Sequence, residues 1–115
     1  MKILVLGAGR IGAKVIRQLR KNREIAIVTV DPREAPYAVK QGIISALDYS
    51  VDLRPFELEP IIREVKPDLV LVTTSPEDIS RSIIPGLDIL VDALSREIET
   101  AFSVPVIAVS RTGIK

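Results

Sequence analysis

The sequence contains no cysteine, no histidine and no tryptophan, and one methionine, among its 115 residues. Without cysteine and histidine, the chain forms no disulfide bond, thiolate nucleophile, Ser-His triad, imidazole base or ordinary Cys/His zinc site. Its chemistry therefore depends on carboxylates, lysine, tyrosine, hydroxyls, backbone amides or a bound cofactor. The acidic residues show no spacing typical of a catalytic dyad or a metal cage, so we predict no catalytic residue and no metal site.

Long apolar runs and an excess of one charge are also missing. No segment reaches the ~20 apolar residues that a membrane-spanning helix needs. The first apolar run, Ile3–Leu6, is short and ends in a glycine-rich turn, unlike a signal peptide. We expect a cytoplasmic protein without membrane insertion. Sixteen basic and fifteen acidic residues give a net charge of +1, which argues against a nucleic-acid partner.

The chain does have enough apolar residues, 47%, for one well-packed core. Aliphatic runs alternate with helical periods, which predicts an α/β fold: a single doubly wound Rossmann-like domain over residues 1–115, with a mostly parallel sheet of about six strands. The strands expected are Lys2–Leu6, Ile25–Val30, Ile43–Leu47, Asp68–Thr73, Leu87–Val91 (with a helical continuation as the alternative) and Val104–Val109. The helices expected are Arg10 to about Asn22, Pro36–Gln41, one through Leu58 and Val65 that stops at Pro67, one that begins at Ser75 and ends at Pro85-Gly86, and Ser95 to about Phe102.

One motif carries most of the functional argument. Gly7-Ala8-Gly9-Arg10-Ile11-Gly12 reads G-x-G-x-x-G between a buried strand and an amphipathic helix, the context in which this pattern predicts dinucleotide binding. Gly7 permits the tight turn, Gly9 lets a pyrophosphate approach the backbone, and Gly12 lets the helix pack closely on the sheet. The start of the helix then offers N–H groups to the phosphates.

An acidic residue follows at the expected distance. Asp31 ends the second strand, nineteen residues after Gly12, close to the ~20-residue spacing of a ribose-binding carboxylate. Its charge favours NAD(H), because it repels a 2′-phosphate. Arg33 softens that preference, since it is able to pair with such a phosphate. NADP(H) is therefore the alternative cofactor.

Polar residues at other strand ends extend the candidate site. Hydroxyls after the fourth strand face the crevice where strand order reverses, although they equally suit a strand end and a helix cap. Asp48 suits either the adenine amino group or an ordinary turn. The candidate cofactor-binding residues are Gly7, Ala8, Gly9, Arg10, Ile11, Gly12, Asp31, Pro32, Arg33, Asp48, Thr73, Thr74 and Ser75.

With the glycine motif, Asp31, Asp48 and the stretch 68–75 in place, the chain resembles the nucleotide-binding domain of RCK/KTN-type potassium-transport regulators over most of its length. The resemblance implies a Rossmann fold with strand order 3-2-1-4-5-6, a bound NAD(H) or related nucleotide, and a dimer or larger ring. The chain is also similar to the leading domain of ATP-grasp enzymes through Asp31, Ala35-Pro36 and Asp48. Through Thr73–Pro76 it is similar to the cofactor half of Rossmann oxidoreductases.

Together these features predict a stand-alone NAD(H)-binding module, regulatory or ligand-sensing, without catalysis of its own. Two alternatives are a small NAD(P)-dependent oxidoreductase subunit completed by another protomer or chain, and a nucleotide-free Rossmann-like scaffold that works through a partner protein. Because a short chain leaves sheet edges thinly covered, we also expect a homodimer.

Overall fold

The computed structural model describes residues 1–73 and 87–109, with backbone only for 87–94. A parallel sheet lies at its centre in the order β2-β1-β3-β4. The strands are β1 (Lys2–Leu6), β2 (Ala26–Val30), β3 (Leu69–Val72) and β4 (Val106–Ala108). The helices are α1 (Arg10–Leu19), α2 (Tyr37–Lys40), α3 (Pro55–Val65) and α5 (Leu87–Phe102). The described residues thus form an α/β fold with four strands, fewer than the six predicted.

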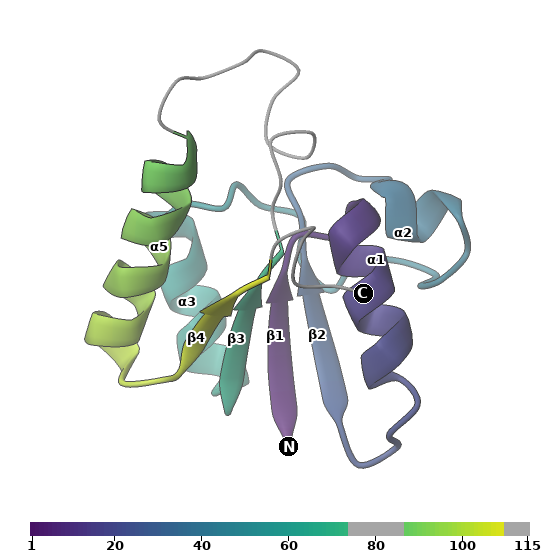
Figure 1. Ribbon diagram of the computed structural model, residues 1–115, viewed down its shortest axis with the longest axis horizontal. Helices are drawn as coiled ribbons and strands as arrows, with labels where there is room; N and C mark the ends of the chain where they lie inside the picture. The colour runs from purple at the N-terminus through teal and green to yellow at the C-terminus, as the bar shows by residue number, and fades with distance from the viewer. Residues whose placement is uncertain (74–86, 110–115) are drawn as a thin grey trace.

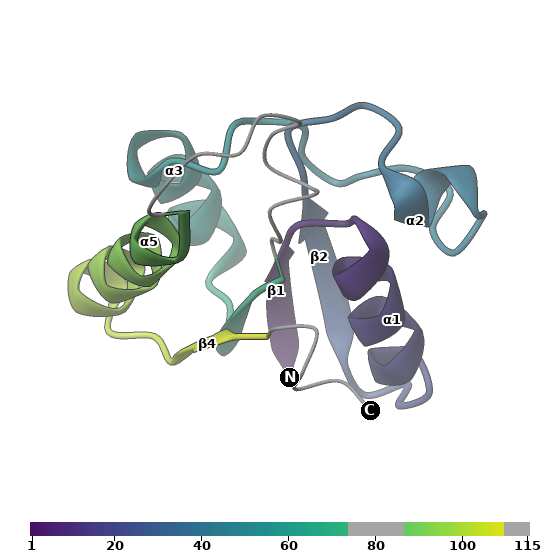
Figure 2. The same cartoon turned by 45° about the horizontal axis from the view of Figure 1, so that its top comes forward.

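Helices cover both faces of this sheet. The chain moves from β1 to β2 in one direction and then from β2 past β1 to β3 and β4 in the other. Because parallel crossovers are right-handed, this reversal places α1 on one face and α3 and α5 on the opposite face. Figures 1 and 2 show this division, with α2 beside α1. The direction reverses at β1, so the carboxyl ends of β1 and β3 lie side by side at the point where folds of this kind commonly bind ligands.

Strand alternation divides the apolar side chains between two cores. Leu4, Leu6 and Val70 pack against α3 and α5, whereas Ile3 and Val5 pack against α1 and α2. All of β1 beyond Lys2 is buried. This two-sided burial explains why the first strand is a continuous aliphatic run.

Most predicted elements are confirmed with small changes at their ends. The strand at Lys2–Leu6 is confirmed in full as β1, and α3 covers the apolar positions Leu58 to Val65. Its end at Lys66, which adopts a left-handed conformation (φ 52°), fits the predicted stop at Pro67. The first helix ends at Leu19 rather than near Asn22, because the amides of Lys21 and Asn22 bond three residues back in a tightened turn.

The predicted strand at Ile43–Leu47 is wrong. The amides of Ile43 and Ile44 both donate to the carbonyl oxygen of Ala38, and the Arg20 guanidinium donates to that of Ile43. These backbone groups therefore form hydrogen bonds near the end of α2 and do not pair with β2. The chain meets the edge of β2 at Asp48, which bonds to Thr29, and at Tyr49, which forms a parallel bridge with Val30.

The predicted strand at Leu87–Val91 is also wrong, and the helical alternative is correct. These residues form the first turns of α5, which continues without a break to Phe102. The edge of β3 away from β1 pairs with β4, so no place remains there for another strand. The predicted helix from Ser75 to Pro85-Gly86 lies outside the described residues.

Among the described residues, no helix is both long enough and apolar enough to cross a membrane.

Candidate functional site

The G-x-G-x-x-G segment forms a buried turn between β1 and α1. Gly7 has φ 107°, a value that side chains other than glycine rarely adopt, and its amide donates to the Val30 carbonyl oxygen at 2.7 Å. Gly7, Ala8 and Gly9 are all buried. The carbonyl oxygen of Ala8 accepts a hydrogen bond from the Ala38 amide at 2.9 Å, which anchors α2 to the turn. The turn is therefore fixed from both β2 and α2.

Gly12 brings α1 against this turn. A Cβ atom at Gly12 would lie 2.1 Å from the Gly7 carbonyl oxygen and 2.9 Å from Thr73 Oγ1. The close approach predicted for the third glycine of the motif is thus present. Thr73 is fully buried, and its hydroxyl lies 2.7 Å from the Gly7 carbonyl oxygen and 3.1 Å from that of Leu6. Thr73 therefore binds the glycine turn itself to the end of β3.

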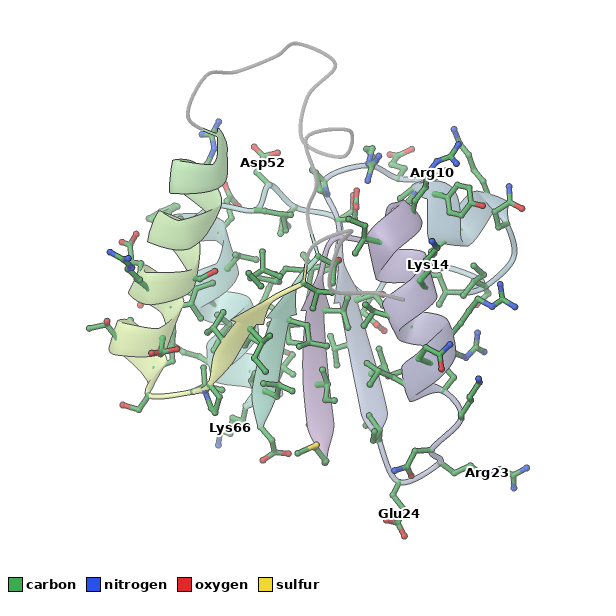
Figure 3. The ribbon with its side chains drawn as sticks, viewed as in Figure 1. Arg10, Lys14, Arg23, Glu24, Asp52 and Lys66 are labelled. Atoms are coloured by element: carbon green, nitrogen blue, oxygen red, sulfur yellow. The ribbon has the colours of Figure 1, made fainter. Side chains whose placement is uncertain are left out.

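The start of α1 is electropositive. Its cap residue is Gly9, so no side chain accepts from the first N–H groups of the helix, and the first turn has no acidic residue. Arg10 occupies the first helical position, and its guanidinium carbon lies 5.1 Å from the centre of the Tyr37 ring. Figure 3 shows Arg10 and Lys14 at this end of α1. Backbone and side chains together suit an anionic ligand.

Asp31 lies directly beside the turn. Its side chain is 1% exposed, and Oδ2 accepts from the Ala8 amide at 2.8 Å. Arg33 supplies three further bonds of 2.9 Å: its amide and Nε donate to Oδ1, and Nη2 donates to Oδ2. The carboxylate thus joins the glycine turn to the residues after β2, and Arg33, expected to meet a 2′-phosphate, pairs with Asp31.

Asp48 is exposed and lies at the edge of β2. Its Oδ2 accepts from the amide of Thr29 at 2.8 Å and from the Thr29 hydroxyl at 3.1 Å. The Asp48 amide donates to that same hydroxyl at 3.2 Å. This reciprocal pair satisfies the outer edge of β2, as an ordinary turn aspartate would. Contact between Asp48 and adenine stays a prediction.

The neighbouring Tyr49 continues this edge toward α3. Its hydroxyl donates to Glu64 Oε2 at 3.3 Å. Partial loss of solvent, followed by the charge of Glu64, raises the pKa of Tyr49 above its usual value, so the phenol remains a donor at neutral pH.

The structure therefore brings together the glycine turn, Asp31, Arg33 and Thr73, at the carboxyl ends of β1, β2 and β3 (Figure 1). Ile11 is buried beneath the start of α1, and Pro32 is exposed next to Asp31. Asp48 lies apart from this group, on Thr29. Thr74 and Ser75 lie outside the described residues. Within residues 1–73 and 87–109, no cluster of three or more acidic side chains is arranged to hold a metal ion.

Three features of the site escaped sequence reasoning. Tyr37 serves as a platform for Arg10, and Thr29 is the partner of Asp48. Neither pairing has a sequence signal, because each joins separate segments. The third, the bond from the Arg33 amide to Asp31, had one: an aspartate before proline commonly accepts from the amide two residues on.

Comparison with models of known protein families, with curated proteins and with solved structures finds no match to this chain.

Proposed function

We propose that this chain is a Rossmann-like module that binds a nicotinamide dinucleotide, NAD(H) or NADP(H), at the turn between β1 and α1. One observation carries the proposal: a buried glycine turn opens α1 without a side-chain cap, beside a buried carboxylate at the end of β2. This arrangement matches what a dinucleotide requires, namely N–H groups for the pyrophosphate and polar groups for the adenosine ribose.

Charge supports the proposal. Arg10, Lys14 and Arg17 lie on α1, and the first acidic residue of the chain is Glu24, after the helix has ended. Arg10 and Lys14 lie at the turn, whereas Glu24 lies at the opposite end of the sheet (Figure 3). Arg10 and Lys14 therefore add positive charge near the end of α1 that would meet the pyrophosphate, although Arg17 places charge in the last turn as well.

The proposed role is binding without turnover, as a regulatory or ligand-sensing subunit. The resemblance to RCK/KTN-type domains supports that role. A nucleotide-free scaffold is the second candidate, and one observation favours it: Asp31 and Thr73 already bind other groups of the protein. The two candidates differ in whether the glycine turn has a ligand.

Calorimetric titration of the nucleotide-stripped protein with NADH and NADPH tests the proposal. We expect micromolar binding of at least one of them. Gly9→Val should weaken that binding about tenfold or more, because a branched side chain at the turn keeps the pyrophosphate from the backbone. Gly9 has φ −77°, outside the left-handed region that favours glycine, so no positive-φ strain opposes valine there.

Ala26→Val is the matched control, because Ala26 is exposed at the start of β2, at the far end of the sheet. It should leave the affinity unchanged. Absence of binding by either nucleotide, with the fold intact by circular dichroism, would contradict the proposal and favour the scaffold.

We also propose a homodimer formed through the β4 edge. Within the described residues, β4 pairs with β3 alone, and Ile107 is 52% exposed. The β2 edge is less suited to pairing, because Tyr49 and Asp48 bond to it. Light scattering at tens of micromolar should give about twice the mass of the chain, and a monomer there would contradict the dimer.

A further inference from the structure

One surface of the molecule carries a large share of its positive charge. Residues 10–23, which form α1 and the turn after it, contain six basic residues and no acidic one. We call these six the basic face, and all of them are exposed: Arg10, Lys14, Arg17, Arg20, Lys21 and Arg23. They are six of the sixteen basic residues of the chain, so the other ten stand against all fifteen acidic residues, a net charge of −5.

The basic face follows from the way α1 packs. The apolar side chains of the helix are buried against the sheet, so its charged side chains point to solvent. Arg10, Lys14 and Arg17 recur at helical spacing, and Lys21 continues their row in the turn after the helix. At 1.5 Å per residue, the row is about 16 Å long. The cations therefore form a line along one side of the domain.

The basic face keeps its charge in the folded chain. None of its side chains forms an ion pair with an acidic residue within 1–73 and 87–109. Arg10 lies over the Tyr37 ring, and the Arg20 guanidinium donates to the Ile43 carbonyl oxygen, but both partners are uncharged. A basic residue in the last turn of a helix favours the helix dipole, which accounts for Arg17. That effect is confined to the last turn, so it does not account for the whole row.

The surface around the basic face indicates which kind of polyanion fits it. A protein interface needs apolar or aromatic anchors at its centre, and stable membrane attachment needs an apolar group besides basic charge. Among the described residues, the exposed large hydrophobic side chains are Met1, Phe56 and Ile107, none of which lies on α1 or α2. Nucleic acid differs, because phosphate contacts supply essentially all of its non-specific binding. A row of cations without apolar neighbours therefore suits a phosphate backbone best.

The net charge of +1 argues against a nucleic-acid partner only if charge is spread evenly over the surface. Glu57, Glu64 and Glu97 lie on α3 and α5, which cover the opposite face of the sheet (Figure 2). Salt limits the interaction between exposed charges to about 8 Å at physiological ionic strength, and the domain measures 37 × 30 × 27 Å. Phosphates at the basic face would therefore meet its local charge and not the average of the chain.

We propose that the basic face of α1 is a docking surface for nucleic acid, which it contacts through the phosphate backbone without reading the base sequence. This surface is distinct from the proposed dinucleotide site except at Arg10 and Lys14, which lie near the glycine turn (Figure 3). Arg17 and Lys21 lie toward the other end of the helix, so substitutions there separate the two activities.

Fluorescence anisotropy with a labelled DNA duplex of about 20 base pairs, titrated with the full chain, tests the proposal. We expect a micromolar dissociation constant at 50 mM salt. A row of about four phosphate contacts predicts a slope of about −3.6 for the logarithm of the binding constant against that of the salt concentration. The affinity should therefore fall about a hundredfold between 50 and 200 mM salt. A second duplex of unrelated sequence should bind equally well.

Two double variants locate the contact. Arg17→Gln with Lys21→Gln removes two of the expected phosphate contacts, so the slope should fall by about two and the affinity at 50 mM salt about tenfold or more. Arg54→Gln with Arg96→Gln is the matched control, because it removes the same charge from exposed residues at α3 and α5. It should leave the slope and the affinity unchanged. Circular dichroism confirms that both variants are folded.

The proposal is overturned if the duplex does not bind at 50 mM salt with the protein at about 100 micromolar, or if both double variants weaken binding equally. Binding to phosphatidylcholine vesicles with about one third anionic lipid, without binding to the duplex, would also overturn it and assign the basic face to a membrane surface. Calorimetric titration of Arg17→Gln with Lys21→Gln by NADH should match that of the wild type. Failure of the dinucleotide site and failure of the basic face are therefore observed separately.

Discussion

Gly12→Ala should lower the free energy of unfolding by about 3 kcal/mol or more, the upper range for overpacking a close-packed site. The added Cβ would lie 2.1 Å from a backbone oxygen, that of Gly7, which no side-chain rotation relieves. Either α1 moves off the sheet or the glycine turn moves, and the second breaks the 2.7 Å bond between Gly7 and Thr73. Thermal unfolding followed by circular dichroism should show a melting temperature lower by roughly 12 to 20 °C.

Gly42→Ala is the control for this change. Gly42 has a positive φ, +72°, unlike Gly12, which lies inside α1, and a Cβ atom there would have no other atom within 4 Å. Only backbone strain opposes alanine at this position, about 1 kcal/mol. Equal losses for the two variants would contradict the larger cost expected from the close approach of α1 to the glycine turn at Gly12.

Asp31→Ala should have the second largest effect on stability, about 3 kcal/mol. It removes a buried carboxylate, which leaves the buried Ala8 amide without its acceptor and breaks the ion pair with Arg33. A buried donor left without its acceptor costs about 1–3 kcal/mol. Urea denaturation gives the change in free energy directly.

Substitution of Arg33, the partner of Asp31, should lower the free energy of unfolding less. Arg33→Ala leaves Asp31 with the amides of Ala8 and residue 33, and it removes a side chain that is 38% exposed. We expect a loss of about 1 kcal/mol, the size of a modest hydrogen-bond contribution. Equal destabilisation by Arg33→Ala and Asp31→Ala would contradict the argument that the burial of Asp31 makes its loss the more costly of the two.

The central strands could be predicted from sequence because they are buried on both faces. β1 and β3 are continuous aliphatic runs next to turn residues. In a small α/β domain, such a run is typical of a strand that is buried on both faces. Leu87–Val91 is equally apolar, yet it is helical. A short apolar run fits a buried strand and one side of a helix alike, so its length and composition do not decide between them.

The candidate site, like the fold, could be predicted from the sequence only in part. The glycine motif predicted the tight turn at Gly7 and the close approach at Gly12, because both follow from backbone sterics. The partners of Asp31 did not follow from spacing. Whether a carboxylate binds a ligand or a neighbouring arginine depends on side-chain positions that a motif does not contain. Thr73 likewise gave no sign that its hydroxyl would reach back to Gly7.

The bonds from Thr73 also mean that the glycine turn is completed late during synthesis of the chain. β1, α1 and β2 are contiguous and adjacent, so this unit is able to form from local contacts. Its glycine turn, however, is completed by a residue 66 positions after Gly7. Until that residue leaves the ribosome and β3 pairs with β1, one whole side of the first strand remains open. The emerging chain therefore exposes one edge of the five-residue apolar strand β1, and at this stage chaperone binding or aggregation competes with folding.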